Sequence, residues 1–363
     1  MARLEEVCEI LDSKRVPITA KDRVAGPYPY YGANGVQDYV ADYIFDDELV
    51  LLAEDGGHFG SADKPIAYRV SGKCWVNNHA HVLKAKECIE VDYLCYSLMF
   101  RDVSDIVNGA TRQKLTQADM RKIKIPLLPI EKQKAVVAKI GKVFELIALR
   151  KEQLEKLDEL VKSRFIELFG DQKANPFGWP QTTIGDCCTL KSGTSLPADK
   201  ENEGGRIPYV KVGDMNYPGN EQYITTSSRF VTEQTAGAGI FPVGTVIFPK
   251  RGGAIGTNKK RLTTLPICAD LNVMGVTAGN ALKSQYLMAY FNMVDLGALD
   301  NGSSVPQINN KDIAPLVICL PPLALQEQFA AFVEQTDKSK LAVQNSIAEL
   351  EELKKALMQK YFG

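Results

Sequence analysis

Two glycine-rich loops carry charged side chains at corresponding places in the two halves of the sequence. Glu54 and Asp55 precede a Gly-Gly pair after one apolar run, and Lys250 and Arg251 precede a Gly-Gly pair after another. Glycine beside polar side chains lets a backbone approach a ligand closely. Arg and Lys donate to guanine O6 and N7, whereas Glu and Asp accept from cytosine N4. A shared framework with opposite charges predicts two readers of different nucleotide sequences; the alternative for Glu54 and Asp55 is an acidic turn in solvent.

Polar and aromatic side chains in neighbouring loops extend these two candidate sites. Positive charge is clustered there: nine Lys or Arg against two acidic residues over 110–142, and five against none over 249–262. This clustering offsets the weak argument against DNA binding from a net charge of −1. The candidate DNA contacts of the first half are Tyr30, Tyr31, Asn34, Glu54, Asp55, His58, Asn78, His79, Arg112 and Lys114. Those of the second half are Tyr209, Lys211, Lys250, Arg251, Thr257, Asn258, Lys259, Asn272 and Gln307.

The same search predicts neither a metal site nor a catalytic site. His79 and His81 stand two apart, as on one strand face, but no third ligand accompanies them, and the eight cysteines include no C-x-x-C pair. The chain has no G-x-x-x-x-G-K-[ST] loop, and the segment beginning Asn175-Pro176 lacks the second proline of an amino-methyltransferase motif. We therefore expect no catalytic residue and no cofactor in this chain.

A repeat positions these loops. The segment 154–170 is matched by 347–363 at an offset of 193 residues, and Asp119 matches Asp312 at the same offset. Residues 4–8 resemble 184–188, and 50–57 aligns with 246–253. The segment 129–133 resembles 322–328, which predicts two added residues in the second copy. The order is therefore module, helix, module, helix.

Each repeat ends in a predicted long helix. The first is expected from near Ile130 to about Phe169, after a proline and before a glycine. Apolar residues recur at heptad spacing, which predicts an antiparallel pair of helices about 60 Å long at ~1.5 Å per residue. The apolar stripe along which the two helices would pack, here called the seam, is weaker from Thr336 to Lys340. The alternative to a helix pair is that each helix packs only on its own domain. The predicted helix-pair interface is Ile140, Ile147, Leu154, Leu157, Val161, Val343, Ile347, Leu350 and Leu357.

The predicted fold class is mixed α/β (α+β): two globular domains separated by two long antiparallel coiled-coil helices, with an internal pseudo-twofold repeat. The length of 363 residues fits two domains. The expected boundaries are 1–125 (first module), 126–170 (first helical spacer), 171–318 (second module) and 319–363 (second helical spacer). No apolar run approaches the ~20 residues that span a bilayer, and the start lacks signal-peptide features, so we expect a cytoplasmic protein.

Across essentially its whole length the chain resembles the specificity (S) subunit of type I restriction–modification systems. The resemblance rests on the paired helix starts, the Leu-x-x-Leu-x-x-Leu helices, Pro-Tyr-Tyr-Gly-Ala-Asn-Gly at 29–35, Ala-Glu-Asp-Gly at 53–56, Ile-Pro-Tyr-Val-Lys-Val-Gly-Asp-Met at 207–215 and Phe-Pro-Lys-Arg-Gly-Gly-Ala-Ile-Gly at 248–256. Each motif alone is weak, and their combination is specific.

The resemblance implies a non-catalytic DNA-binding subunit. Each module would be a target-recognition domain for one half of a bipartite, asymmetric site, and the helices would set the spacer. The expected partners are double-stranded DNA, two modification subunits that methylate adenine N6 with S-adenosylmethionine, and motor–nuclease restriction subunits that use ATP with Mg.

Two other functions fit the same sequence less well. A protein-binding scaffold predicts apolar loop tips, whereas these tips are polar and rich in glycine. A single-chain nuclease or methylase predicts clustered carboxylates with strongly shifted pKa values.

Overall fold

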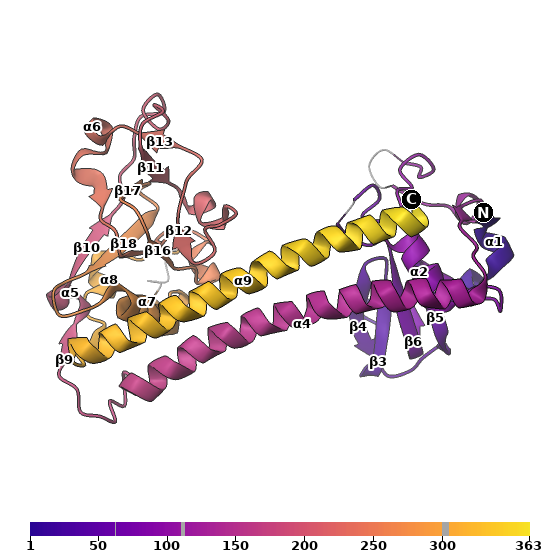
Figure 1. Ribbon diagram of the computed structural model, residues 1–363, viewed down its shortest axis with the longest axis horizontal. Coiled ribbons are helices and arrows are strands. Elements are labelled where there is room, and N and C mark those ends of the chain that lie inside the picture. The colour runs from indigo at the N-terminus through magenta and orange to yellow at the C-terminus, as the bar shows by residue number, and fades with distance from the viewer. Residues whose placement is uncertain (62, 110–112, 300–304) are drawn as a thin grey trace. The chain divides into compact units, whose positions relative to one another are not determined.

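The computed structural model describes residues 1–61, 63–109, 113–299 and 305–363 (Figure 1). The chain divides into two compact units. The first unit contains Met1–Glu152 and Gln344–Gly363, and the second contains Gln153–Val343. Each unit holds one module and one half of each long helix.

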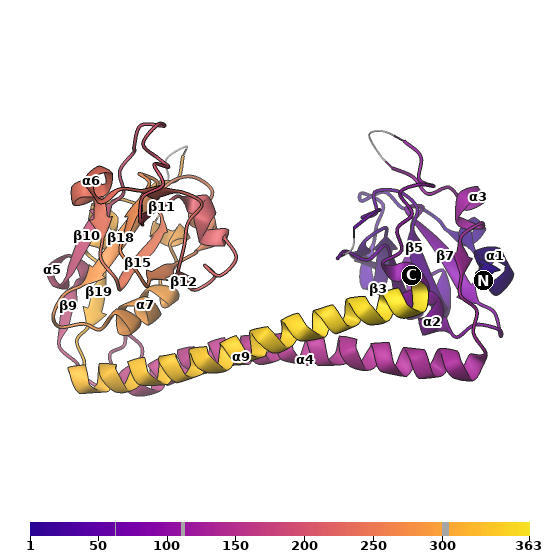
Figure 2. The ribbon, with the colours of Figure 1, turned by 45° about the horizontal axis from the view of Figure 1, so that its top comes forward.

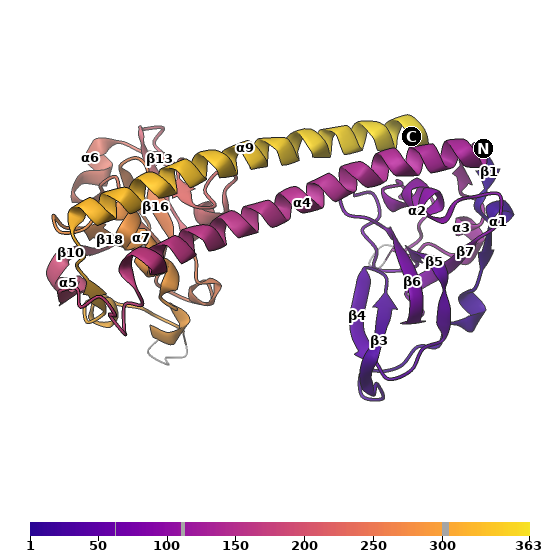
Figure 3. The ribbon, with the colours of Figure 1, turned by 60° about the horizontal axis from the view of Figure 1, so that its bottom comes forward.

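The first module is built on a six-stranded sheet of order β2-β7-β5-β6-β3-β4 (Figure 3). The strands of the whole module are β1 (Ala2–Arg3), β2 (Cys8–Ile10), β3 (Ala25–Gly32), β4 (Gly35–Val40), β5 (Phe45–Ala53), β6 (Ala67–Val76), β7 (Ala80–Ala85) and β8 (Lys124–Ile125). Its short helices are α1 (Leu4–Val7), η1 (Asp12–Lys14), α2 (Val91–Met99) and α3 (Gln117–Met120).

Strand β5 lies inside this sheet and is buried on both faces. Val50 and Leu52 join the cluster that contains α2 and the start of the first long helix, whereas Leu49 and Leu51 join a cluster on the opposite face. A strand covered on both sides needs a continuous apolar run, which is the pattern of residues 49–53. The apolar run that precedes Glu54 in the sequence is therefore part of a buried strand.

The second module contains a five-stranded sheet, β10-β18-β15-β16-β12, and a four-stranded sheet, β13-β11-β17-β14 (Figure 2). Its strands are β9 (Gln181–Thr183), β10 (Cys188–Ser192), β11 (Ile207–Val210), β12 (Tyr223–Ile224), β13 (Phe230–Val231), β14 (Ile240–Phe241), β15 (Thr245–Pro249), β16 (Arg261–Thr263), β17 (Ile267–Ala269), β18 (Val273–Ala278) and β19 (Val317–Cys319). Its short helices are α5 (Ile184–Cys187), η2 (Val212–Asn216), α6 (Glu233–Ala236), η3 (Gly237–Gly239), η4 (Ile255–Thr257), α7 (Ser284–Met293), η5 (Gly297–Leu299) and α8 (Asn310–Ile313). Strand β15 is the counterpart of β5, and its side chains also alternate between two buried clusters.

The long helices are α4 (Ile130–Phe169) and α9 (Leu323–Phe362), each of 40 residues. Their ends differ by 193 residues, so the repeat extends to the helix boundaries. The prediction of two long helices, each preceded in the sequence by a mixed α/β module, is confirmed.

Equivalent buried glutamines anchor both helices to their modules. The side-chain oxygen of Gln133 accepts from the N–H of Glu90 (2.8 Å), and that of Gln326 accepts from the N–H of Lys283 (2.8 Å). Their amide groups each donate to two carbonyls at matching positions. The predicted two-residue insertion in the second copy is therefore wrong: the offset stays at 193, and the equivalent of Gln133 is Gln326, not Gln328.

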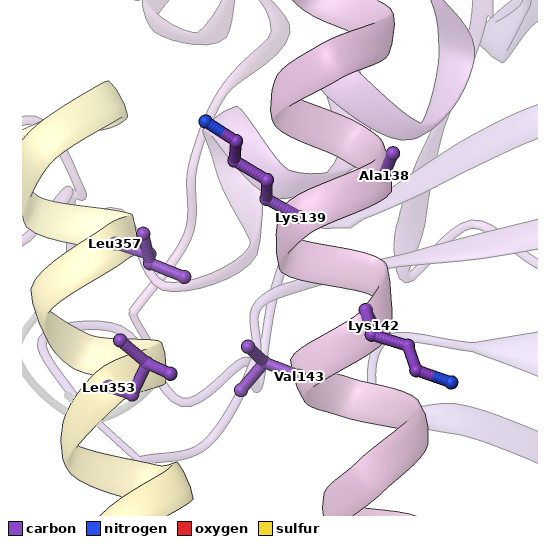
Figure 4. A pocket seen from close by; sticks show the side chains of 6 residues that line it. All are labelled: Ala138, Lys139, Lys142, Val143, Leu353 and Leu357. Atoms are coloured by element: carbon purple, nitrogen blue, oxygen red, sulfur yellow. The ribbon is translucent and has the colours of Figure 1, made fainter.

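Within each unit the two helices run antiparallel against each other. In the first unit Lys151 lies 3.5 Å from Glu351, and Val143 faces Leu353 and Leu357 across the seam (Figure 4). The C-terminal end of each helix also packs on the module of the other repeat, through matching aromatic pairs. Tyr93 contacts Phe362 at a ring-centroid distance of 5.0 Å in the first unit, and Tyr286 contacts Phe169 at 4.8 Å in the second.

The residues predicted to form the seam are buried to different extents. Ile140, Ile147 and Val343 are buried, whereas the others are partly buried: Leu154, Leu157, Val161, Ile347, Leu350 and Leu357. None of the described helices is both long enough and apolar enough to cross a membrane.

Candidate nucleic-acid interface

Three segments of the first module meet where strand β5 ends. Glu54 and Asp55 follow the strand, 77–79 form the turn between β6 and β7, and 113–115 precede α3. The N–H of Glu54 donates to the carbonyl of His79 (2.9 Å), and the N–H of Leu115 donates to the carbonyl of Glu54 (2.7 Å). Backbone hydrogen bonds therefore hold the strand end between the other two segments.

The polar side chains at this end are paired with one another. Asp55 Oδ1 lies 2.7 Å from His79 Nδ1, and Lys114 Nζ lies 2.9 Å from Glu54 Oε1. The Lys114 side chain is 51% exposed, but that of Glu54 is only 11% exposed. Lys114 thus remains a candidate contact at the surface, whereas the side chains of Glu54 and Asp55, the latter 15% exposed, lie largely beneath it.

A buried ion network supports this end from below. His81 Nδ1 lies 2.6 Å from Asp12 Oδ2, and its Nε2 lies 2.9 Å from the carbonyl oxygen of Leu115. A carbonyl and an ionised carboxylate only accept hydrogen bonds, so both ring nitrogens donate and His81 carries a positive charge. Arg15 completes the network by donating to Glu54 Oε2 (2.6 Å).

Both carboxylates of the network stay ionised at neutral pH. Burial acts to raise the pKa of Asp12, but hydrogen bonds from His81, Gln117 and the Val82 N–H, with the charge of His81, hold it below its usual 3.8. For Glu54, burial is likewise outweighed by Arg15 and Lys114, and its pKa is lowered. Glu54 is therefore a partnered positioning group, and it is not proposed to contact a cytosine directly.

The network is not arranged as a metal centre. Asp12, Glu54 and His81 have ligand atoms within 4.8 Å of one another. However, both nitrogens of His81 donate hydrogen bonds, and the guanidinium of Arg15 occupies the space beside both carboxylates. A metal ion would need a deprotonated imidazole and would face that positive charge. The chemistry of these groups fits a charge-balanced structural network.

The second module repeats the backbone framework with different side chains. The N–H of Lys250 donates to the carbonyl of Asn272 (2.8 Å), and the N–H of Ile308 donates to the carbonyl of Lys250 (2.9 Å). A bridge between Arg251 and Gln307 corresponds to the bridge between Asp55 and Lys114 in the first module. The two modules therefore present different residues from the same three-segment framework.

Lys250 is a buried cation with a neutral partner. The residue is 8% exposed, and its Nζ donates to Ser192 Oγ at 2.8 Å. Burial, and then the neighbouring charge of Arg251, lowers the pKa of Lys250. In the part of the chain that the structure describes, neither Lys250 nor the exposed Arg251 forms a salt bridge with a carboxylate. An ammonium has three donors, so this site retains donors for an external acceptor such as guanine O6 or a phosphate oxygen.

The other cations of this loop serve the fold. Lys260 Nζ donates to the carbonyl of Val294 (2.7 Å) and to Asn258 Oδ1 (2.6 Å), and burial lowers its pKa to about 8. The guanidinium of Arg261 donates to the carbonyl of Met215 (3.0 Å), and Lys259 donates to Asn216. Lys260 and Arg261 are thus turned inward, which their sequence alone does not reveal, whereas Lys259 is partly buried.

Two predicted aromatic contacts lie in the module cores. Tyr30 is 1% exposed and its hydroxyl accepts from the N–H of Ile18, while Tyr209 is fully buried and donates to the carbonyl of Thr194 (3.0 Å). Neither ring is accessible to a base, because each fills the interior of its module. Direct base contact through Tyr30 or Tyr209 is therefore not proposed.

The remaining predicted contacts differ in accessibility. Lys211 is paired with Glu201 at 2.6 Å, and Arg112 lies outside the described residues. The exposed members are Asn34, Asn78, Lys114, Arg251, Thr257 and Asn258. The partly buried members are Tyr31, Asp55, His58, His79, Lys211, Lys259, Asn272 and Gln307.

A family comparison decides what these modules belong to. The type I restriction modification DNA specificity domain matches residues 1–159 and 176–354, which is most of the chain and both repeats. The chain belongs to this family. The match supports DNA sequence recognition as the role of the family's domains in this chain.

Individual relatives agree with this assignment. The chain is 25% identical over 359 residues to a putative type I restriction enzyme specificity subunit of Haemophilus influenzae, covering 95% of this chain and 88% of that protein. It is 23% identical over 302 residues to a type I restriction enzyme specificity subunit of Methanocaldococcus jannaschii, covering 76% and 69%.

A solved structure shows the same fold. The S subunit of a type I restriction–modification system from M. genitalium aligns with a TM-score of 0.59 at 14% identity, covering 100% of this chain and 95% of that one. At this identity the likeness concerns the fold alone. The specificity-subunit family and its fold are thus established for this chain independently of its loop residues.

Proposed function

We propose that this chain is a non-catalytic specificity subunit that reads a bipartite DNA site, with one module for each half. The carrying observation is the three-segment framework at the ends of β5 and β15. It presents Asp55 and Lys114 in one module and Arg251 and Gln307 in the other. Equal scaffolds with different tips suit the recognition of two different short sequences.

The helices α4 and α9 supply the spacer in this proposal. Each has 40 residues, or about 60 Å at ~1.5 Å per residue. An antiparallel pair resists bending better than one helix and fixes the distance between the half-sites along the duplex. The proposed domains are 1–125 and 171–318 as readers, with 126–170 and 319–363 as spacers.

The proposed partners supply all of the chemistry. Two modification subunits would use S-adenosylmethionine to methylate adenine N6, and restriction subunits would use ATP with Mg to cleave unmodified DNA. One solved structure with the same fold, at a TM-score of 0.59 and 20% identity, comes from work on complex assembly of a type I restriction–modification system. The alternative of a protein-binding scaffold is less well supported, because exposed side chains of the three-segment framework, such as Asn78, Lys114 and Arg251, are polar or charged.

Binding to random duplex DNA, with and without modification subunits, tests this function. An electrophoretic shift whose affinity falls steeply between 50 and 200 mM salt, roughly as expected for several phosphate contacts, supports a DNA reader. Binding of the modification subunits with no effect on DNA affinity would instead support the scaffold.

A further inference from the structure

The buried seam between α4 and α9 changes character in the second unit. Val333, Thr336, Lys340 and Val343 follow a three-four-three spacing on α9, and all four are buried, with Lys340 at 9% exposure. The seam therefore continues through the segment that the sequence marks as weak, but with polar side chains inside it. A charged residue at such a position normally lowers stability and specifies register.

Lys340 is held by groups from three different elements. Its Nζ lies 2.6 Å from Asp158 Oδ1 of α4 and 3.7 Å from Asp337 Oδ1 of α9, and 3.5 Å from Gln222 Oε1 beside β12. Of these contacts, the one with Asp158 crosses from α9 to α4 and therefore depends on the axial alignment of the two helices. A shift by one helical turn, about 5.4 Å, would separate the ammonium from Asp158.

The same cluster fastens the second module to α9. Tyr223 of β12 donates its hydroxyl to Asp337, and the amide of Gln222 donates to Asp337 Oδ1 at 3.2 Å. Burial, and then the bond to Asp337, raises the pKa of Tyr223, so the hydroxyl stays protonated and remains a donor. β12 is an edge strand of the five-stranded sheet, so this contact ties the sheet to the helix.

The first unit provides an internal comparison at the repeat-equivalent positions. There Val143, Phe144 and Ile147 stand where the second unit has Thr336, Asp337 and Lys340. Val143 and Ile147 are buried, and Phe144 stacks on Tyr96 of α2 at a ring-centroid distance of 5.5 Å. Apolar contacts thus suffice to pack this part of the seam. The polar set in the second unit is not required for packing alone.

We propose that Lys340, with Asp158, Asp337, Gln222 and Tyr223, is a polar pin that fixes the helix register and seats the second module on α9. The pin thereby determines the single spacer length that the chain accepts between half-sites. This inference rests on the proposed function, because a spacer has meaning only for a bipartite reader. Lys340 acts as a positioning residue and needs no contact with DNA.

The test measures adenine methylation by the complete complex of this chain with its modification subunits, on duplexes whose half-sites are fixed and whose spacer varies. In Lys340→Met, methylation at spacers one base pair longer or shorter should rise about tenfold relative to the preferred spacer, the scale of coupling between contacting groups. Half-site preference should not change. The matched control is Ile147→Met, which makes a conservative change at the repeat-equivalent position and should keep the single spacer.

A gentler variant covers the case in which Lys340→Met does not fold. Tyr223→Phe removes only the hydroxyl that reaches α9 and should likewise broaden the range of spacer lengths that the complex methylates. Tyr290→Phe is the control: the Tyr290 hydroxyl donates to the carbonyl of Val317 within the module, so its loss should leave the range of spacers unchanged. Unchanged spacer selectivity in a folded Lys340→Met or Tyr223→Phe complex would overturn the pin. A wild-type complex that methylates without any preferred spacer would instead overturn the proposed function.

Discussion

Glu54 and Lys250 occupy the same position in the two modules and carry opposite charges. Each follows the last residue of a central strand, each is buried, and each is held by backbone bonds to the same two segments. Glu54 is surrounded by cations, whereas Lys250 bonds to Ser192 and stands beside Arg251. The charge of Glu54 is thus balanced within the first module, whereas the second module retains hydrogen-bond donors for a ligand.

Arg251→Ala should weaken recognition at one half-site. The exposed guanidinium is the best-placed donor of the second module, so its loss should cost about 1–3 kcal/mol and relax specificity at that half-site only. Methylation of single-base variants of the whole site is the measurement. Lys173→Ala, the same charge change outside the three segments, is the control and should leave the profile unchanged. An Arg251→Ala profile identical to wild type would remove this residue from the interface.

Asp12→Asn should destabilise the first module in a pH-dependent way. The carboxylate partners a buried, charged His81, so its loss should lower the free energy of unfolding by about 3 kcal/mol at pH 7. The pKa of Asp12 is lowered from 3.8 by folding, so its contribution is present above that pH and is lost as the pH falls through the folded pKa. The difference in the free energy of unfolding between wild type and Asp12→Asn, measured by urea denaturation, should therefore become smaller below pH 3.8. Asp42→Asn, at an exposed position, should show no such gap; a gap that stays constant in acid would contradict the network.

Gln133→Leu and Gln326→Leu should destabilise their units to a similar extent. Each substitution leaves one N–H and two carbonyls without their buried partner, which should cost about 3 kcal/mol. Chemical denaturation of each variant, beside Gln328→Leu, provides the comparison. Gln328 is exposed and should tolerate the change. A larger loss of unfolding free energy in Gln328→Leu than in Gln326→Leu would show that Gln328, and not Gln326, is the equivalent of Gln133.

The long elements could be predicted from the sequence because their signals are local. Proline before Ile130 and glycine after Phe169 mark the ends of α4, and continuous apolar runs mark β5 and β15. The error at Gln326 arose because a second glutamine stands two residues later, and identity alone does not say which one is buried.

The candidate site was less accessible to prediction because its partners are distant in sequence. Asp12 and His81 are 69 residues apart, and Asp12 and Gln117 are 105 apart, so no local pattern reveals the network. Lys260 and Arg261 contribute to the positive charge counted over 249–262, but they donate to the carbonyls of Val294 and Met215 inside the module. Exposure, not residue type, separates Arg251 from them.

Lys260 should give the second module a distinct pH dependence. Its pKa is about 8 in the folded chain against an ordinary value of 10.5, so between these values the unfolded chain binds more protons. The free energy of unfolding should then rise with pH by up to about 3 kcal/mol relative to Lys260→Met. Unfolding from about pH 7 to about pH 10 tests this, with exposed Lys311→Met as control. If the free energy of unfolding followed the same pH dependence in wild type and Lys260→Met, burial would not lower the pKa of this lysine.

The most direct test of the central claim lengthens the spacer while leaving both readers intact. Seven residues inserted after Gln153 and seven after Ser346 add about 10 Å to each helix, or about three base pairs at ~3.4 Å each. Methylated adenines are then mapped in cells that carry this chain and its modification subunits. The account predicts unchanged half-sites with a spacer about three base pairs longer. Altered half-sites with the original spacer would contradict it.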